Sequence, residues 1–369
     1  MHSRFFSSLP EGLRCELCPR RCLIPENGTG VCGVRGCRDG KGRIPYYGYI
    51  TALVADPIEK KPLYHFRPGT SILSAGFAGC NLRCPFCQNW HLSQIPGTGH
   101  AAPQSAGIPG RRLSPEELIA VVKEATFQEG ASRKGTSQEG TSQIAYTYSE
   151  PLVHAEYLLD CMRLARKGGI ANVLVTNGCV NSEAAKEILS LTDAANIDLK
   201  CFSPETYRSL LGGNLKTVLD FITLAVETGV HTEITTLVVP GLNDGEGELE
   251  DCAAFIAGLV RDRGGLGAVP WHLSAYHPDY RWKAPPTEGR RLREAARRAK
   301  KRLRHVYTGN LMGETGDTLC PDCGRPLITR RAYRIDTGGL ETAERDGKTF
   351  YRCAFCKNPA PVAGAGFTI

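Results

Sequence analysis

Residues 70–90 read TSILSAGFAGCNLRCPFCQNW, an apolar run that leads straight into a loop with three cysteines. Residues 70–78 have the length and apolar content of a buried strand. In the loop, Cys80, Cys84 and Cys87 follow the spacing C-x3-C-x2-C. In a chain with 16 cysteines among 369 residues, this spacing arises by chance about 0.03 times. The loop is therefore expected to bind a metal or a cluster.

Three thiolates at this spacing predict a [4Fe-4S] cluster with one incomplete corner. Four cysteines normally complete such a cube, so a triplet leaves one iron without a protein ligand. That iron is expected to bind the amino and carboxylate groups of S-adenosylmethionine (SAM). Electron transfer to the sulfonium would then release a 5′-deoxyadenosyl radical, which the protein must place against a substrate hydrogen. A zinc knuckle that recruits His91 is the alternative interpretation.

Beyond this loop, strand and helix patterns alternate as far as residue 308. Helices are predicted over residues 113–128, with Ser114 as cap, and over 152–167, 182–191, 215–228, 246–261 and part of 281–304. Strands are predicted over residues 144–148, 171–176, 194–199, 231–239, 269–276 and 305–308.

This alternation predicts an α/β fold with a parallel sheet, wound into a full or partial (βα) TIM-type barrel with its chemistry at the carboxyl ends of the strands. An open doubly wound sheet is the alternative, although no Gly-x-Gly-x-x-Gly follows the first strand. We expect a Cys-rich module over residues 1–66, the barrel over 67–311 and a zinc-ribbon-like module over 312–369.

Two polar stretches, residues 97–112 and 129–143, are predicted to be flexible loops because they bury little apolar surface. The net charge of +7 gathers over residues 281–304. There the apolar side chains fall at helical spacing, which predicts a surface helix with a solvated basic face; a nucleic-acid surface is the less favoured interpretation. No apolar run is long enough to span a bilayer and no signal peptide is evident, so a cytoplasmic protein is expected.

Cysteines also cluster at both ends of the chain. The N-terminal set is Cys15, Cys18, Cys22 and Cys32. It suits zinc, which is slightly favoured, or a second iron–sulfur cluster, and disulfides are the alternative.

The C-terminal set forms two C-x2-C knuckles, Cys320 with Cys323 and Cys353 with Cys356. A zinc ribbon is predicted here, with a rubredoxin-like iron site as the next option and a hairpin between the knuckles.

The sequence resembles the radical SAM superfamily, whose signature C-x3-C-x-aromatic-C has Phe86 at its aromatic position. Within that superfamily it is similar to the group called AmmeMemoRadiSam-system radical SAM enzymes, related to the glycyl-radical-enzyme activases such as pyruvate formate-lyase activating enzyme. The segments that carry the similarity are residues 15–22, 56–66 (DPIEKKPLYHF), 76–94, 145–151 (AYTYSEP), 173–178 (VLVTNG), 196–200 (NIDLK), 233–244, 270–280 and 306–310.

The resemblance implies roles for particular residues. Glu150 stands where the family has the carboxylate of a Gly-Gly-Glu motif that holds the SAM ammonium, but Tyr148 and Ser149 replace the glycines. A plain helix-start residue is the alternative for Glu150. Asn177, Asp198 and Lys200 are implied to face the ribose and carboxylate of SAM, and His277 to lie near SAM and substrate. Ordinary structural polarity is the alternative for all of them.

The function expected from this resemblance is reductive cleavage of SAM followed by hydrogen abstraction from an unidentified substrate. The alternatives are an activase that installs a glycyl radical on a partner protein, and a non-enzymatic zinc protein that binds nucleic acid or a protein. A ferredoxin or flavodoxin is the implied electron donor. AMMECR-type and Memo-type proteins are implied as candidate partners, whereas a membrane or nucleic-acid partner is not expected.

Overall fold

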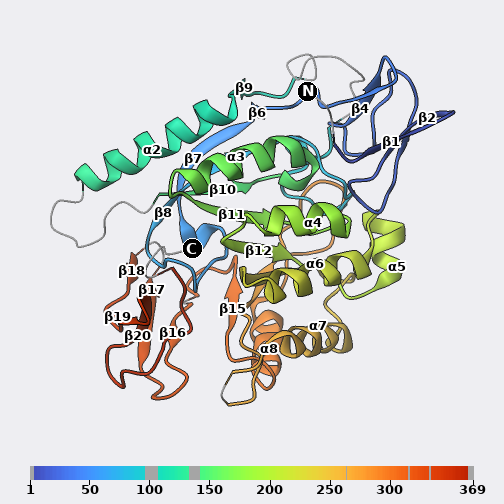
Figure 1. Ribbon diagram of the computed structural model, residues 1–369. Helices are drawn as coiled ribbons and strands as arrows, with labels where there is room; N and C mark the ends of the chain where they lie inside the picture. Colours follow the sequence, from blue (N-terminus) through green and yellow to red (C-terminus); the bar gives the residue numbers. More distant parts are fainter. Residues whose placement is uncertain are drawn as a thin grey trace.

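The computed structural model describes residues 4–95, 107–132, 142–262, 264–314, 316–331 and 334–364. Its centre is an eight-stranded sheet of order β15-β14-β13-β12-β11-β10-β8-β7 (Figure 1). The strands are β7 Ala52–Pro57, β8 Ser71–Gly76, β10 Gln143–Thr147, β11 Ala171–Thr176, β12 Ala194–Asp198, β13 His231–Val238, β14 Trp271–Ala275 and β15 Val306–Gly309.

All neighbours from β8 to β15 pair in parallel, and β7 alone is antiparallel, on the outer edge of β8. No pairing joins β15 back to β7 in the described part of the chain. The predicted (βα) fold is therefore confirmed, and it is a partial barrel. Its parallel strands from β10 to β14 are buried almost throughout, as expected of a parallel sheet covered on both faces, whereas the edge strand β7 is partly exposed.

Helices connect consecutive strands, as the alternating pattern predicts, and Figure 1 shows several of them lying along the sheet. They are α2 Pro115–Ser132, α3 Ala155–Lys167 preceded by the 3-10 turn η3 Pro151–His154, α4 Ser182–Leu189, α6 Leu215–Glu227, α7 Glu246–Leu259 and α8 Gly289–Ala299. Shorter pieces are α1 Trp90–Ser93, α5 Pro204–Thr206 and the π-helical turn η4 Tyr207–Leu211.

Local signals explain how these helices begin. At the start of α2, the Ser114 N–H donates to Glu117 Oε2 at 2.7 Å and the Glu117 N–H donates to Ser114 Oγ at 3.2 Å. This is a capping box, which satisfies two backbone donors that a helix end otherwise leaves free. The predicted cap at Ser114 is confirmed.

The predicted flexible loops are partly wrong. The backbone of α2 continues through Ser132, because a helix once nucleated extends at little cost per residue. In the other stretch, Ile108 is buried and its carbonyl accepts a hydrogen bond from the Tyr49 hydroxyl at 2.8 Å. The strand β9 Arg111–Arg112 then pairs with β6 Tyr49–Ile50. The remainder of the two stretches, residues 97–106 and 133–141, lies outside the described residues.

The basic helix α8 buries Leu292, Ala295, Ala296 and Ala299, the apolar face that its spacing predicts. Several of its arginines pair with acids of neighbouring elements. Arg298 lies 2.6 Å from Glu246 of α7, and Arg293 lies 2.8 Å from Glu314. These pairs stabilise the helix against its neighbours and occupy cations that a nucleic-acid surface would need free.

Two small cysteine-rich regions flank the barrel. The N-terminal region contains β1 Phe6–Leu9, β2 Gly12–Cys15, β3 Leu23–Ile24, β4 Gly36–Arg38 and β5 Lys41–Arg43. The C-terminal region contains β16 Thr318–Leu319, β17 Pro326–Arg331, β18 Arg334–Asp336, β19 Leu340–Arg345 and β20 Lys348–Cys353. Between the two C-terminal knuckles, β17 pairs antiparallel with β18 and β19 with β20, so the predicted hairpin is confirmed.

A buried ion pair ties the N-terminal region to the barrel. Arg35 Nη1 and Nη2 donate to the two carboxylate oxygens of Glu156 in α3, at 2.7 and 2.9 Å. Both side chains are almost wholly buried, with exposures of 1% and 4%. A bidentate pair of this kind fixes orientation as well as distance.

Residues 61–66, which we call the floor segment, cross the inside of the barrel below the strand ends. The Pro62 carbonyl accepts from Asn196 Nδ2 of β12 at 2.8 Å, and the His65 N–H donates to Glu233 of β13 at 2.7 Å. The Tyr64 ring packs edge-on against His272 of β14, with 4.7 Å between centroids. The segment therefore closes the barrel from below and leaves the carboxyl ends of the strands open.

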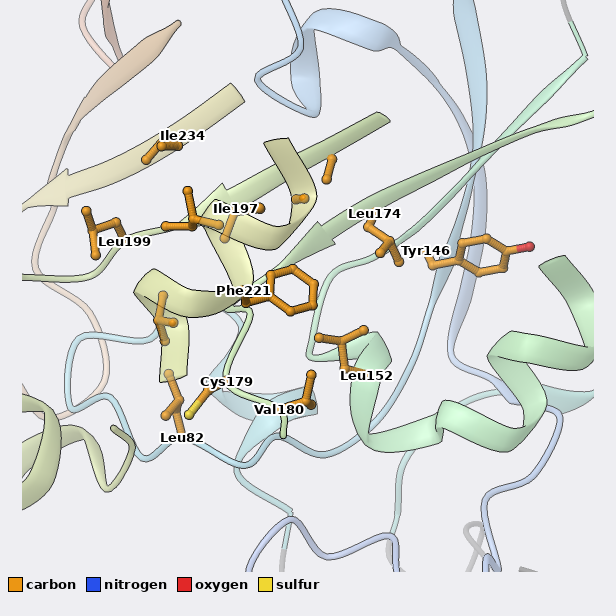
Figure 2. Packing of buried hydrophobic residues seen from close by; sticks show 14 of the residues in the cluster. Leu82, Tyr146, Leu152, Leu174, Cys179, Val180, Ile197, Leu199, Phe221 and Ile234 are labelled. Carbon is orange, nitrogen blue, oxygen red and sulfur yellow. The ribbon is translucent and has the colours of Figure 1, made fainter. Parts of the chain in front are cut away.

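The hydrophobic core reaches from the helices to the cysteine loop. Figure 2 shows Phe221 of α6 and Ile197 of β12 in this core, with Leu82 of the loop beside Cys179. The loop is thus anchored by apolar packing as well as by its backbone. Within the described ranges, no single helix is long and apolar enough to cross a membrane, and one pair bent by 113°, Pro204–Leu211 with Leu215–Glu227, meets the requirement by length and composition.

Candidate active site

A cavity of about 240 Å³ lies at the carboxyl ends of the parallel strands. Its walls come from the cysteine loop, from the loops after β10, β11, β12 and β15, and from the ends of β13 and β14. The residues that line it include Cys80, Cys84, Phe86, Cys87, Tyr148, Ser149, Glu150, Asn177, Asp198, Lys200, Thr235, Leu237, Ser274 and Asn310. The structure therefore brings together every residue predicted for the cluster and SAM except His277.

The cysteine loop is fixed at both ends. Gly79 precedes it with a φ of +81°, and a side chain there would collide with the Cys32 carbonyl, so glycine is required. The Leu82 N–H donates to Cys80 Sγ at 3.3 Å, and Cys87 Sγ lies 3.1 Å from Ser93 Oγ. The three thiols are free and face one cavity.

The alternative of a zinc knuckle at this loop is not supported. Tetrahedral zinc with four sulfur ligands at about 2.3 Å holds those sulfurs only about 3.8 Å apart. Among the described residues, no group of ligand atoms that includes the loop thiols lies within 4.8 Å of one another. His91 is exposed and does not line the cavity.

Glu150 is the most strongly held acid in the cavity, with 1% of its surface exposed. Its carboxylate accepts from Thr176 Oγ1 at 2.6 Å, from the Asn177 N–H at 2.8 Å and from the Leu152 N–H at 3.0 Å. The last bond makes Glu150 the cap of η3, so this residue both starts a helix and lines the cavity. A carboxylate has about four lone-pair sites, and three bonds leave room for one more donor.

The protonation of Glu150 is finely balanced. Burial raises the pKa of this carboxyl to about 7, although its three hydrogen bonds act in the opposite direction. A cationic ligand in the cavity would favour the ionised form, because an opposite charge at short range lowers the pKa of an acid.

Tyr148 adopts the backbone conformation that a glycine would normally supply, with a φ of +69°. Its hydroxyl donates to Asp56 Oδ2 at 2.7 Å, and Lys61 Nζ lies 4.6 Å from the centre of its ring. A Cβ on Gly76 would come within 2.8 Å of Tyr148 Cδ2, so this glycine of β8 leaves space for the ring. The motif without glycines is therefore held in place by the contacts with Asp56 and Lys61 and by close packing against β8.

Asp198 and Lys200, at the end of β12, pair with each other. Lys200 Nζ lies 2.7 Å from Asp198 Oδ2, and the Lys200 N–H donates to the Tyr207 hydroxyl at 3.0 Å. Burial lowers the pKa of Lys200, but Asp198 and the nearby thiols raise it by a larger amount, so this pKa lies above its ordinary value. A ligand that uses these two groups would have to share them or separate them.

Asn177 braces the cysteine loop rather than standing free. Its Nδ2 lies 3.0 Å from Asn81 Oδ1 and 3.6 Å from Cys80 Sγ, and its Oδ1 accepts from the Cys179 N–H at 2.8 Å. His277 lies at the rim: it is exposed, and its Nε2 is 3.2 Å from the Asn310 carbonyl.

The sequence reasoning missed several lining residues. Thr235 and Leu237 lie two positions apart on β13, so their side chains point to the same face of the sheet. Leu237 is in register with Ser274 of β14, and all three residues line the cavity. The alternation of side chains along neighbouring strands, counted from Asp198 and Ser274, could therefore have predicted Thr235 and Leu237. Thr235 Oγ1 and Ser149 Oγ are buried without a hydrogen-bond partner. Unsatisfied polar atoms of this kind fit a cavity that is completed by a polar ligand.

The two flanking cysteine sets differ in geometry. In the C-terminal set all four sulfurs lie within 4.8 Å of one another, with Cys320 and Cys356 at 3.6 Å and Cys323 and Cys353 at 3.7 Å. Backbone N–H groups lower the pKa of Cys353 to about 7 against the effect of burial. These four thiols fit a single tetrahedral metal ion. The N-terminal set is not gathered to this distance.

Comparisons with known proteins agree with this geometry. The family model described as the radical SAM superfamily matches residues 76–253. An uncharacterized protein of Methanocaldococcus jannaschii is 36% identical over 356 residues, which cover 95% of this chain and 96% of that protein. The chain therefore belongs to the radical SAM superfamily, a family that implies a [4Fe-4S] cluster and SAM.

Two further matches involve activating enzymes. The pyruvate formate-lyase 1-activating enzyme of Escherichia coli K12 is 27% identical over 206 residues, 54% of this chain and 74% of that enzyme. The crystal structure of a domain of pyruvate-formate lyase-activating enzyme from Bacteroides vulgatus has 20% identity and a TM-score of 0.39, and it covers 46% of this chain and 99% of that domain.

Proposed function

We propose that this protein is an enzyme that cleaves SAM reductively and uses the resulting radical to abstract hydrogen from a substrate that remains to be identified. The observation that carries this proposal is the cavity itself. It presents the free thiols of Cys80, Cys84 and Cys87 beside a buried carboxylate and two polar atoms without partners. This donor set suits a cluster with one open corner and a zwitterionic ligand next to it.

The lining residues suit the parts of SAM. When bound, the cluster supplies the electron that breaks a C–S bond of SAM. Glu150 has one free acceptor position and would hold the ammonium group through a charge-assisted hydrogen bond. Asp198 would accept from the ribose hydroxyls, Lys200 would pair with the SAM carboxylate, and Asn177 would keep Cys80 in position. Phe86, the aromatic residue of the loop, would shield this corner from water.

A narrower assignment also belongs to this proposal. We place the protein in the AmmeMemoRadiSam system, with AMMECR-type and Memo-type proteins as candidate partners and a ferredoxin or flavodoxin as electron donor. The C-terminal cysteines would hold zinc, and the many free thiols suit a reducing compartment such as the cytoplasm.

Activation of a glycyl-radical enzyme is the second candidate function. It is favoured by the match to a pyruvate formate-lyase 1-activating enzyme over 206 residues. This candidate predicts that a partner protein acquires a glycyl EPR signal when mixed with the reduced protein and SAM. A small-molecule or peptide substrate predicts no such signal.

The decisive experiment is anaerobic reconstitution with iron and sulfide, followed by an assay for 5′-deoxyadenosine with dithionite and SAM. The wild-type protein should form the product, and Cys84→Ala should abolish it because the cluster loses a ligand. Cys252→Ala, in a buried cysteine of α7 away from the cavity, is the matched control and should retain the activity. Undiminished product from Cys84→Ala would refute the proposal.

A further inference from the structure

The N-terminal region holds four thiols that the proposed reaction does not use. Cys15, Cys18 and Cys32 are buried, and Cys22 is half-buried; all four are free. They fall within a span of 18 residues in the sequence. Four soft ligands this close suit either one zinc ion or an iron–sulfur cluster, and the two differ in how far apart they hold their sulfurs.

The C-terminal cysteine set provides a comparison for the distance between sulfurs. The C-terminal thiols come together at 3.6 and 3.7 Å, the spacing that one tetrahedral ion requires. Neither the N-terminal thiols nor the three of the cysteine loop meet within 4.8 Å of one another in the described structure, which includes all of them. A cube of several irons and sulfides is larger than a single ion, so its ligands stand farther apart.

The N-terminal cysteines nevertheless lie next to one another. The Cys15 N–H donates to the Cys22 carbonyl at 2.9 Å, and Cys18 begins the turn between them, where its carbonyl accepts from the Arg21 N–H at 3.1 Å. A Cβ on Gly30, two positions before Cys32, would lie 3.6 Å from Cys22 Cβ. The four cysteines are therefore neighbours whose sulfurs lie too far apart for one ion. From these observations we propose that Cys15, Cys18, Cys22 and Cys32 bind an iron–sulfur cluster rather than zinc.

Hydrogen-bond donors surround these sulfurs in the manner a cluster needs. Arg35 Nε donates to Cys15 Sγ at 3.3 Å, and backbone N–H groups donate to Cys18 and Cys32. Arg35 is itself 1% exposed, so its charge acts at short range in a dry environment. Donors to the sulfurs stabilise thiolate ligands and tune the potential of a bound cluster.

The position of the N-terminal cysteine set indicates a role for a cluster bound there. Arg20 Nε donates to the Asn81 carbonyl at 2.8 Å, and Arg83 of the cysteine loop donates to the Val31 carbonyl. The Cys32 carbonyl packs directly against Gly79. The N-terminal cluster would thus lie against the loop that must receive an electron, and it could pass one on, which zinc cannot. This use rests on the proposed function, whereas the metal assignment does not.

The test removes the loop cluster and asks what metal remains. In a Cys80→Ala/Cys84→Ala/Cys87→Ala variant, reconstituted anaerobically, we expect iron and acid-labile sulfide to persist, with an EPR signal after reduction by dithionite. Zinc should stay at one equivalent, bound by the C-terminal thiols. A variant that holds no iron, with two equivalents of zinc or with an empty N-terminal site, would overturn the assignment.

A second pair of variants locates the remaining iron. Adding Cys18→Ser to the triple variant should remove the iron and the EPR signal. Adding Cys37→Ser instead should leave both unchanged, because Cys37 is a buried cysteine of the same region outside the set of four. Equal iron loss from both additions would count against the site. If wild-type protein makes no 5′-deoxyadenosine while the triple variant retains iron, the proposed function fails and the cluster assignment stands.

Discussion

Replacing Glu150 by glutamine is expected to weaken SAM binding about 10-fold to 150-fold, because a hydrogen bond to a charged partner contributes about 1.5–3 kcal/mol. The change keeps the size of the side chain and removes its charge. The existing contacts at 2.6, 2.8 and 3.0 Å all donate to the carboxylate. A glutamine can accept through one oxygen only, so at least one donor also loses its partner.

The pH dependence of SAM binding should also report on the charge of Glu150. Burial raises the pKa of Glu150 to about 7, above the ordinary value of 4.5 that it regains on unfolding. Between these two values the folded protein binds the proton more tightly, so the ligand-free protein loses stability as the pH rises through this window. The SAM ammonium needs the ionised form. Binding should therefore tighten by up to about tenfold per pH unit below pH 7 and level off above it.

Equilibrium dialysis of the anaerobically reconstituted protein with labelled SAM, across the range from acid to mildly alkaline pH, measures both effects. Glu150→Gln should give weak binding with a flat profile. Glu248→Gln is the matched control, because Glu248 also accepts a backbone N–H, at 2.6 Å from Phe202, and lies outside the cavity. An unchanged dissociation constant and an unchanged pH profile in Glu150→Gln would refute the role given to this carboxylate.

Three further perturbations test the scaffold around the site. Glu156→Ala leaves the Arg35 guanidinium buried and unpaired and should lower the free energy of unfolding by about 3–5 kcal/mol in a denaturant titration; a loss below about 1 kcal/mol would contradict the argument. Tyr148→Phe removes the hydrogen bond to Asp56 and should lower stability by about 1.5–3 kcal/mol in the same titration, whereas an unchanged midpoint would show that the network does not hold the loop. Cys353→Ser should release one equivalent of bound metal, measured by elemental analysis, and full retention would exclude a four-thiol site.

Most of the barrel could be predicted from the sequence because its signals are local. The apolar run over residues 171–176 is the strand β11 without adjustment, since a parallel strand buried on both faces has little polar alternation to obscure it. The start of α2 follows from Ser114 and Glu117, three residues apart. Ile108 was misjudged because its burial depends on Tyr49, which lies far from it in the sequence.

The candidate site also contains both residues that could be predicted from the sequence and features that could not. Residues that follow strand ends, such as Glu150 and Asn177, could be found because the carboxyl ends of parallel strands meet at one edge of the sheet. The pairing of Asp198 with Lys200 could not be found, since their spacing of two residues says nothing about the rotamers that join them. His277 was predicted from the resemblance alone. The turn after β14 places this residue at the exposed rim of the cavity.

The conformation at Tyr148 shows how the backbone before Glu150 is held although Tyr148 and Ser149 replace the two glycines of the motif. A bulky residue with a φ of +69° is strained by about 1–3 kcal/mol and persists only where its surroundings over-determine it. Here Asp56 holds the hydroxyl, Lys61 lies over the ring, and Gly76 leaves space for the ring on β8. Asp56 and Tyr148 are 92 residues apart in the sequence, so no local pattern could reveal the compensation. The backbone path around Glu150 is thus kept by a network anchored in the floor segment, and this network is the physical reason why a chain without the two glycines still presents the carboxylate to the cavity.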